Sequence, residues 1–246
     1  SITGSGGTLT GTTAYDLQGG TVSAILGGTV GLNKTGAGTV TLSGANTYTG
    51  ATNITAGTLS LGVNDALNSA SAVTVNGATA VLNTSTFTDT VASVLLQGGG
   101  TINGSGALTS TAAFDLQSGT VNGVLAGAAG ANKTTGGTVA LNASNTYTGA
   151  TTVSGGTLTL GHATNTLANA STVVVSGGTL GIGGNSDTVA GVQLTSGSIT
   201  GSGGTLTSTT AFDMQGGTVS AILGGTAGLT ATVGTTTLSG TNTYTG

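Results

Sequence analysis

Apolar and polar residues alternate in short runs along the chain. In TVTLS, which begins at Thr39, the apolar residues Val40 and Leu42 alternate with hydroxyl-bearing residues. The same alternation occurs in TLSL from Thr58 and in TLTL from Thr157. Because successive side chains of a β-strand point to opposite faces, each run predicts a short strand with one buried face. The residues that this pattern assigns to the interior are Val22, Val40, Leu42, Leu59, Leu61, Val121, Val139, Leu141, Leu158, Leu160, Leu180, Ile182, Ile199 and Leu238.

These runs recur with two periods. A Gly, a small β-branched residue and usually an apolar residue mark the start of each run, at steps of 17 to 22 residues. The marker residues are Thr21, Thr39, Thr58, Thr79, Thr101, Thr120, Thr138, Thr157, Thr179, Ser198, Thr218 and Thr235. A longer period of about 98 residues contains five such steps, since SITGSGGTLT begins at Ser1 and again at Ser198, with a variant from Thr101 between them.

Repetition at two levels favours a solenoid over a row of immunoglobulin-like sandwiches. A sandwich of about 100 residues would explain the longer period, but it has no reason to repeat itself five times within one domain. A step of about 20 residues fits one coil of a parallel β-helix with two or three strands. Parallel connections are right-handed in nearly all cases. We therefore predict an all-β chain, a right-handed parallel β-helix (β-solenoid) with about 20 residues per coil and five coils per repeat of about 98 residues.

We expect one continuous β-solenoid over residues 1–246, made of repeat units 1–98 and 99–197 and the partial unit 198–246. Gly pairs, such as Gly19-Gly20 and Gly155-Gly156, are predicted at the corners, because Gly reaches positive φ without steric strain.

Two longer segments interrupt the strand pattern at matching places in the repeat. They are VNDALNSASA, from Val63 to Ala72, and HATNTLANAS, from His162 to Ser171. We expect them to be loops that bulge from one side of the solenoid.

One phrase in the repeat resembles a known family. NKTGAGTVTLSGANTYTGATNITAGTLSLG, from Asn33 to Gly62, is similar to the passenger-associated β-strand repeat of bacterial autotransporters and related giant surface proteins. A second copy runs from Asn132 to Gly161, and a drifted copy without the Lys runs from Leu229 to Gly246. The resemblance implies a parallel β-helix in an extracellular location or on the bacterial cell surface.

Composition agrees with a sheet and excludes several functions. The chain has 49 Gly, no Pro, no Cys and only 3% charged residues, with a net charge of −4. Gly disfavours helix, and Pro would remove a hydrogen bond from a sheet. Nucleic acid is excluded as a partner, because its binding needs clustered Lys and Arg. No apolar run is long enough for a transmembrane helix, and the missing starting Met indicates a part of something longer.

The few ionisable side chains do not predict an active site. Asp16, Asp115 and Asp213 occupy one position in successive repeats, so five coils, or about 24 Å, separate them. That distance is too long for a carboxylate pair, and no Arg is present. The segment GGNSDT, which ends at Thr188, faintly resembles a calcium-binding nonapeptide, but a turn capped by Asp187 is the preferred interpretation. We expect no enzyme activity, no cofactor and no metal site.

A Tyr recurs in the phrase NTYTG. We expect Tyr48, Tyr147 and Tyr244 along one edge of the solenoid, as a possible lateral contact or sugar-stacking position. The alternative is a corner residue whose ring covers the end of the core while its hydroxyl stays in water. The Asn two residues earlier is expected to bond to backbone at a turn.

The combined pattern predicts a structural protein. We expect a segment of a long extracellular β-solenoid that forms a fibre, stalk or surface layer, with self-association end to end or side by side. The alternative is an adhesin that binds glycans, polysaccharide or a cell surface through the two loops or the Tyr edge.

Overall fold

The computed structural model describes residues 1–246, which contain strands and no helix. They form two compact units, which we call unit 1 (Ser1–Phe114 and Ser118–Ala126) and unit 2 (Asp115–Gln117 and Gly127–Gly246). The expected repeat boundaries and the expected continuity of one solenoid over the whole chain stay predictions.

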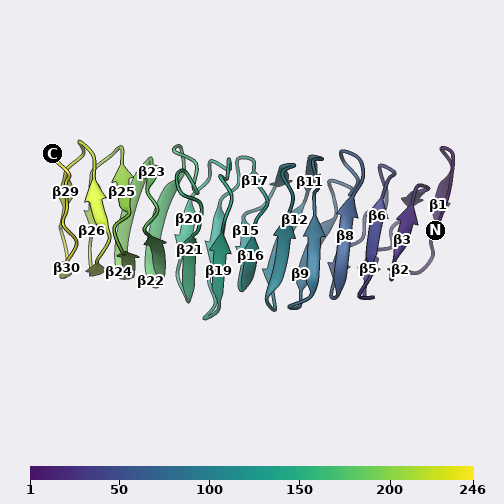
Figure 1. The fold of residues 1–246 in the computed structure, drawn as a ribbon, viewed down its shortest axis with the longest axis horizontal. Helices are drawn as coiled ribbons and strands as arrows, with labels where there is room; N and C mark the ends of the chain where they lie inside the picture. The colour runs from purple at the N-terminus through teal and green to yellow at the C-terminus, as the bar shows by residue number, and fades with distance from the viewer. The chain divides into compact units, whose positions relative to one another are not determined.

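Within each unit, the strands of successive coils lie one after another in chain order (Figure 1). Unit 1 contains β1 (Thr8–Thr10), β2 (Tyr15–Leu17), β3 (Gly20–Val22), β4 (Ile25–Gly27), β5 (Leu32–Lys34), β6 (Thr39–Leu42), β7 (Thr52–Ile54), β8 (Gly57–Leu61), β9 (Ala72–Asn76), β10 (Ala80–Asn83), β11 (Asp89–Val91), β12 (Ser93–Gln97), β13 (Gly100–Asn103), β14 (Leu108–Ser110), β16 (Gly119–Val121) and β17 (Leu125–Ala126), and the first residue of β15 (Phe114–Leu116). Unit 2 contains β18 (Ala131–Lys133), β19 (Thr138–Leu141), β20 (Thr151–Val153), β21 (Thr157–Leu160), β22 (Thr172–Gly183), β23 (Asp187–Val189), β24 (Gly191–Gly201), β25 (Thr205–Ser208), β26 (Phe212–Met214), β27 (Gly217–Val219), β28 (Ile222–Gly224), β29 (Leu229–Thr230) and β30 (Thr236–Leu238).

Every pairing in unit 1 is parallel and joins a strand to the equivalent strand one coil later. One column of strands runs β3–β6–β8–β10–β13–β16, and a second runs β2–β5–β7–β9–β12. A third side carries β1–β4 and β11–β14–β17. Thr39 pairs with Thr58, 19 residues later, and Val81 pairs with Thr101, 20 residues later. This confirms the predicted solenoid and its coil length within the unit.

Unit 2 has the same arrangement. Its columns run β19–β21–β22–β24–β27–β30 and β18–β20–β22–β24–β26–β29, with β23–β25–β28 on the third side. The long strands β22 and β24 serve both columns, since each continues through the corner that separates the two sides. Outside β22 and β24, the strands of both units have two to five residues. Most are therefore shorter than a typical strand, because the corners use the rest of each coil.

The interior of each unit is filled mainly by aliphatic side chains. Every residue that the alternation assigned to the interior is buried, with one exception. Leu238 is 36% exposed, because its strand, β30, pairs with β27 on one side only. The phase prediction is also wrong at Thr79, which lies in a turn before β10, so that Val81 takes the position between Thr58 and Thr101. It is wrong by two residues at Thr21, which pairs with Thr41, and at Thr235, since Thr218 pairs with Thr237.

The corners use Gly as expected at several places. Gly20 has φ 104° and Gly156 has φ 60°, in the left-handed region that other residues rarely adopt. At Gly156 a Cβ would collide with backbone carbonyl oxygens of Thr135 and Gly137, one coil earlier. Gly therefore satisfies both the conformation and the close stacking at this corner.

Candidate functional site

The NTYTG segment forms the third side of its coil without being a regular strand. In the first copy, Asn46–Gly50, the backbone N–H groups of Thr47 and Thr49 donate to the carbonyls of Leu26 and Gly28 in the preceding coil. The segment is therefore held in an extended conformation by the coil beneath it.

The Tyr side chain of this segment points into the core. Tyr48 and Tyr147 are each 0% exposed. Their hydroxyls bond to the hydroxyls of Thr52 and Thr151, at 2.7 and 2.8 Å. This burial contradicts the expected lateral contact for these two residues, since neither ring reaches the surface. The alternative interpretation is correct about the ring and wrong about the hydroxyl, which is buried too. Tyr244 is half-buried, and a lateral contact there stays a prediction.

A chain of buried hydroxyls extends from each buried Tyr to the next coil. Thr52 Oγ1 lies 3.1 Å from Ser71 Oγ, which donates to the Gly50 carbonyl at 2.8 Å. The second copy repeats the chain through Thr151, Ser171 and the Gly149 carbonyl. We call this chain of hydroxyls the Tyr relay. Every polar atom in it has a hydrogen-bond partner, so the buried polar groups are satisfied.

The Asn of the motif connects three coils. Asn46 Oδ1 accepts the backbone N–H of Leu26 at 2.8 Å, and its Nδ2 donates to the Ala66 carbonyl at 2.7 Å. In the second copy, Asn145 Nδ2 donates to the Thr166 carbonyl at 2.8 Å. In the third, Asn242 Oδ1 accepts the N–H of Leu223. The expectation that this Asn bonds to backbone is confirmed.

The two long loops occur where they were expected, but they are not free to bulge. Ala66 and Leu67 in the first loop are buried, and so is Leu167 in the second. Each loop is tied down by an Asp from the following coil. Asp89 Oδ2 accepts the N–H of Leu67, and Asp187 Oδ2 accepts the N–H of Leu167, both at 2.9 Å. The Asp side chains thus cap the loops from the following coil.

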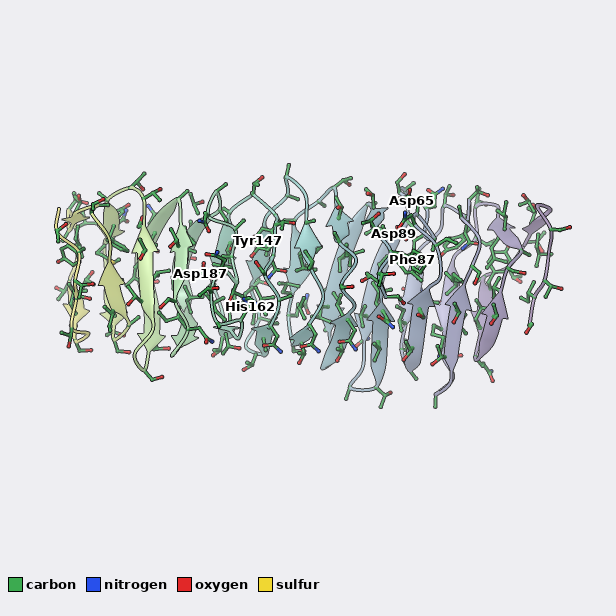
Figure 2. The ribbon with its side chains drawn as sticks, turned by 45° about the horizontal axis from the view of Figure 1, so that its top comes forward. Asp65, Phe87, Asp89, Tyr147, His162 and Asp187 are labelled. Carbon is green, nitrogen blue, oxygen red and sulfur yellow. The ribbon has the colours of Figure 1, made fainter.

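The carboxyl groups of Asp89 and Asp187, both labelled in Figure 2, are buried. Asp89 and Asp187 are 1% and 4% exposed, and their Oδ1 atoms have no hydrogen-bond partner. The pKa of Asp89 is raised to about 7, mainly by burial and to a lesser extent by the charge of Asp65, while the N–H of Leu67 acts in the opposite direction. The pKa of Asp187 is raised to about 6, because the effect of burial exceeds the lowering by the N–H of Leu167 and the charge of His162.

The loops differ in the ionisable residue near the buried Asp. Asp65 has φ 50° and its counterpart Asn165 has φ 51°, so both positions use the left-handed conformation that Asp and Asn tolerate. His162 is half-buried, with Nδ1 2.5 Å from the Thr164 carbonyl oxygen. An acidic neighbour therefore raises one Asp pKa and a His lowers the other.

Both cations of the chain are buried. Lys34 and Lys133 are 0% and 1% exposed. Lys34 Nζ donates to the carbonyls of Gly36 and Ala56, and Lys133 Nζ donates to those of Thr135 and Gly155. Burial lowers the pKa of both ammonium groups. Each Lys thus closes a corner by satisfying carbonyl oxygens of two successive coils.

The repeated Asp row lies on the outer face, away from the buried Asp residues. Asn33 Nδ2 donates to Asp16 Oδ1 in the neighbouring coil, and Asn53 continues the ladder by donating to Asn33. Asp213 accepts the amides of Gln193 and Gln215. No group of three or more His, Cys, Asp and Glu residues comes together in a way that could hold a metal ion. The structure also has no helix that is long and apolar enough to cross a membrane.

The passenger-associated-transport-repeat family matches residues 32–61, 132–160 and 233–246, the segments that carry the buried Lys, Asn and Tyr or their drifted counterparts. These three segments match the passenger repeat. It is 39% identical over 171 residues to a protein described as "Adhesin BmaC autotransporter" from Brucella suis biovar 1 (strain 1330). The match covers 65% of this chain and 5% of the relative. No solved structure matches the chain. The repeats and the relative indicate an extracellular or cell-surface passenger segment.

Sequence reasoning missed the buried charges, although the signal was present. Asp89 lies two residues before Val91, and Lys34 two residues after Leu32, so alternation placed each charge on the inner face. This signal was given no weight, because charged side chains are rarely fully buried in proteins.

Proposed function

We propose that these residues form a structural segment of a long extracellular passenger, which serves as a fibre, stalk or part of a surface layer. The observation that carries the proposal is the stacking itself. Each inner strand pairs in register with the coil before it and the coil after it, as Thr58 does with Thr39 and Val81. Such a stack grows by adding coils, because each coil presents the same edge to the next.

The polar side chains that bond neighbouring coils together support the same role. Asn46 bonds to the coil before it and the coil after it, and the Tyr48 relay reaches Ser71 in the next coil. These contacts resist separation of adjacent coils, which is the load that a stalk carries along its axis. The outer face is built mainly from Thr, Ser, Asn and Gly, and it permits close side-by-side packing.

Electron microscopy of the purified protein tests this role. Ordered filaments or lateral bundles support the structural function, with end-to-end or side-by-side self-association. Separate particles that adhere to glycan surfaces or host cells would contradict it and favour adhesion. A matched sample with Leu42→Asp, which disrupts a buried position, controls for aggregation of unfolded chains.

Adhesion is the second candidate function. The relative is named an adhesin, and the first loop borders a hollow of about 320 Å³. The lining includes Asp65, Asn68, Ser69 and Thr90, which can all form hydrogen bonds to a ligand. Binding of the protein to surface glycans, lost when residues 64–69 are exchanged for residues 164–169, would support this candidate.

A further inference from the structure

A second hollow, of about 280 Å³, lies on the outer face of unit 2 where β22, β24 and β26 run side by side. Thr172 and Val174 line it, and they alternate along β22 with the buried Val173 and Val175. They therefore point away from the core. Gln193 on β24 pairs with Val174 and with Asp213 in the flanking coils. The hollow thus extends across three coils of one sheet.

Gly191 forms the floor of this hollow. Its φ lies outside the left-handed region, so the backbone conformation does not require Gly there. A Cβ at this position would lie 3.1 Å from Thr210 Oγ1 and 3.6 Å from Thr172 Cγ2. Any larger side chain would fill the space between these two Thr residues. The Gly therefore keeps the hollow open.

The polar groups of the hollow are arranged as fixed acceptors. Asp213 Oδ2 accepts Gln193 Nε2 at 2.7 Å and Gln215 Nε2 at 2.8 Å. Two amide donors on one oxygen hold the carboxylate in place and leave Oδ1 able to accept from outside. With its Nε2 engaged, Gln193 presents its own Oε1. Thr210 donates to the Ala190 carbonyl, so its oxygen can also accept.

The chemistry of this site selects a neutral ligand rich in hydroxyl donors. No cation is available to bind an anion, since Lys133, the one basic residue of unit 2 besides His162, is buried. Val174 and Ala211 supply small apolar surface beside the acceptors. The volume lies just below the 300 to 1,000 Å³ range of sites for drug-sized ligands, so it suits one ring rather than a peptide.

We propose that this hollow binds a single sugar ring of a neutral glycan, with ring hydroxyls donating to Asp213 Oδ1 and Gln193 Oε1 and ring C–H groups packing on Val174 and Ala211. This proposal deepens the adhesive candidate and rests on it. One ring has few atoms, so the dissociation constant is expected in the range of roughly 1 to 10 mM. Useful adhesion would then come from many sites on a multivalent surface.

The first repeat provides matched substitutions. The segment DTVAGVQLT, from Asp187 to Thr195, corresponds to DTVASVLLQ, from Asp89 to Gln97. Ser93 and Leu95 thus stand where unit 2 has Gly191 and Gln193. In unit 1 these residues pair in register on β12 with β9, as their counterparts pair with β22. Gly191→Ser and Gln193→Leu should therefore fold, since the same strand already accepts both residues.

The test is an NMR titration of the whole chain with methyl glucoside, methyl galactoside and N-acetylglucosamine, each to about 50 mM, above the expected dissociation constant. At least one sugar should shift the amides of residues 172–174, 191–193 and 210–213. Gly191→Ser and Gln193→Leu should each weaken binding at least tenfold, while the control Ser93→Gly leaves the affinity unchanged. No shift with any of the three sugars, or equal affinity in both variants, would overturn the proposal.

Adhesion assays separate this proposal from the function on which it rests. If Gln193→Leu abolishes sugar binding but the protein still adheres to glycan-coated beads, the hollow is confirmed as a sugar site, and its adhesive role is overturned because adhesion uses another contact. If the wild-type protein binds the sugar but adheres to no glycan-coated or cellular surface, the hollow is confirmed as a sugar site and the proposed adhesive function is contradicted.

Discussion

Acid is expected to stabilise unit 1 through Asp89, in contrast to the usual behaviour of a carboxylate. In the folded chain the pKa of this carboxyl is about 7, against an ordinary value of 3.8. A group whose folded pKa is raised binds its proton more tightly in the native state. Its contribution to stability is therefore fully present below pH 3.8 and is lost as the pH rises through about 7.

The size of the effect follows from the difference between the two pKa values. About three pKa units at 1.36 kcal/mol each give an upper limit of about 4 kcal/mol in the free energy of unfolding. The physical source is the Oδ1 atom, which is buried without a partner and so prefers to be uncharged. Asp65 adds to the effect, because its negative charge opposes a second one nearby.

Denaturant unfolding at several pH values between 4 and 9 measures this contribution. We expect the stability of the wild-type chain to rise as the pH falls from 8 to 5. In Asp89→Asn this slope should become smaller, since Asn keeps the acceptor for the Leu67 N–H and cannot ionise. A wild-type chain that loses stability steadily on acidification, with Asp89→Asn following the same curve, would refute the reasoning.

Three further predictions test the interior with the same unfolding assay. Leu42→Asp should cost several kcal/mol by burying an unpaired charge, and unchanged protease resistance around residues 35–62 would contradict its interior position. Tyr48→Phe should cost about 1 kcal/mol, because it removes a buried hydrogen bond, whereas Tyr244→Phe at the half-buried copy should change little; equal effects would count against the relay. Lys34→Ala should lower the free energy of unfolding by roughly 2 to 4 kcal/mol. Lys34→Met should lower it less, because Met keeps most of the side-chain volume; a larger effect of Met than of Ala would contradict the packing of Lys34 in this corner.

Much of the fold was predictable because the same alternation of apolar and polar residues recurs from coil to coil. The alternation in β6 and β8 places Val40, Leu42, Leu59 and Leu61 inside, and all four are buried. The period was predictable for the same reason, since each coil must return a strand to the same side. The phase failed at Thr79, because the turn before β10 adds residues that no periodic rule can assign to a corner or a strand.

The polar interior was harder to predict, because its partners are backbone groups. Lys34 has no carboxylate to pair with and instead meets carbonyl oxygens of two coils, whose positions exist only once the corners have formed. Similarly, Asp89 meets an N–H of a loop 22 residues earlier. The sequence shows which side chains are present, but it does not show which backbone groups a corner leaves without hydrogen-bond partners. The Tyr48 hydroxyl was assigned to water for the same reason.

These buried polar groups also fix which coils are neighbours. An aliphatic column alone discriminates little between neighbouring coils, since Leu42 lies between Val22 and Leu61, two aliphatic side chains that differ little in chemistry. Such a shift would separate Asn46 from the carbonyl of Ala66 and Asp89 from the N–H of Leu67. Each separation leaves polar groups buried without partners, at a cost of several kcal/mol. The apolar residues therefore drive the chain to stack, while Asn46 and Asp89 favour a single register among many similar ones.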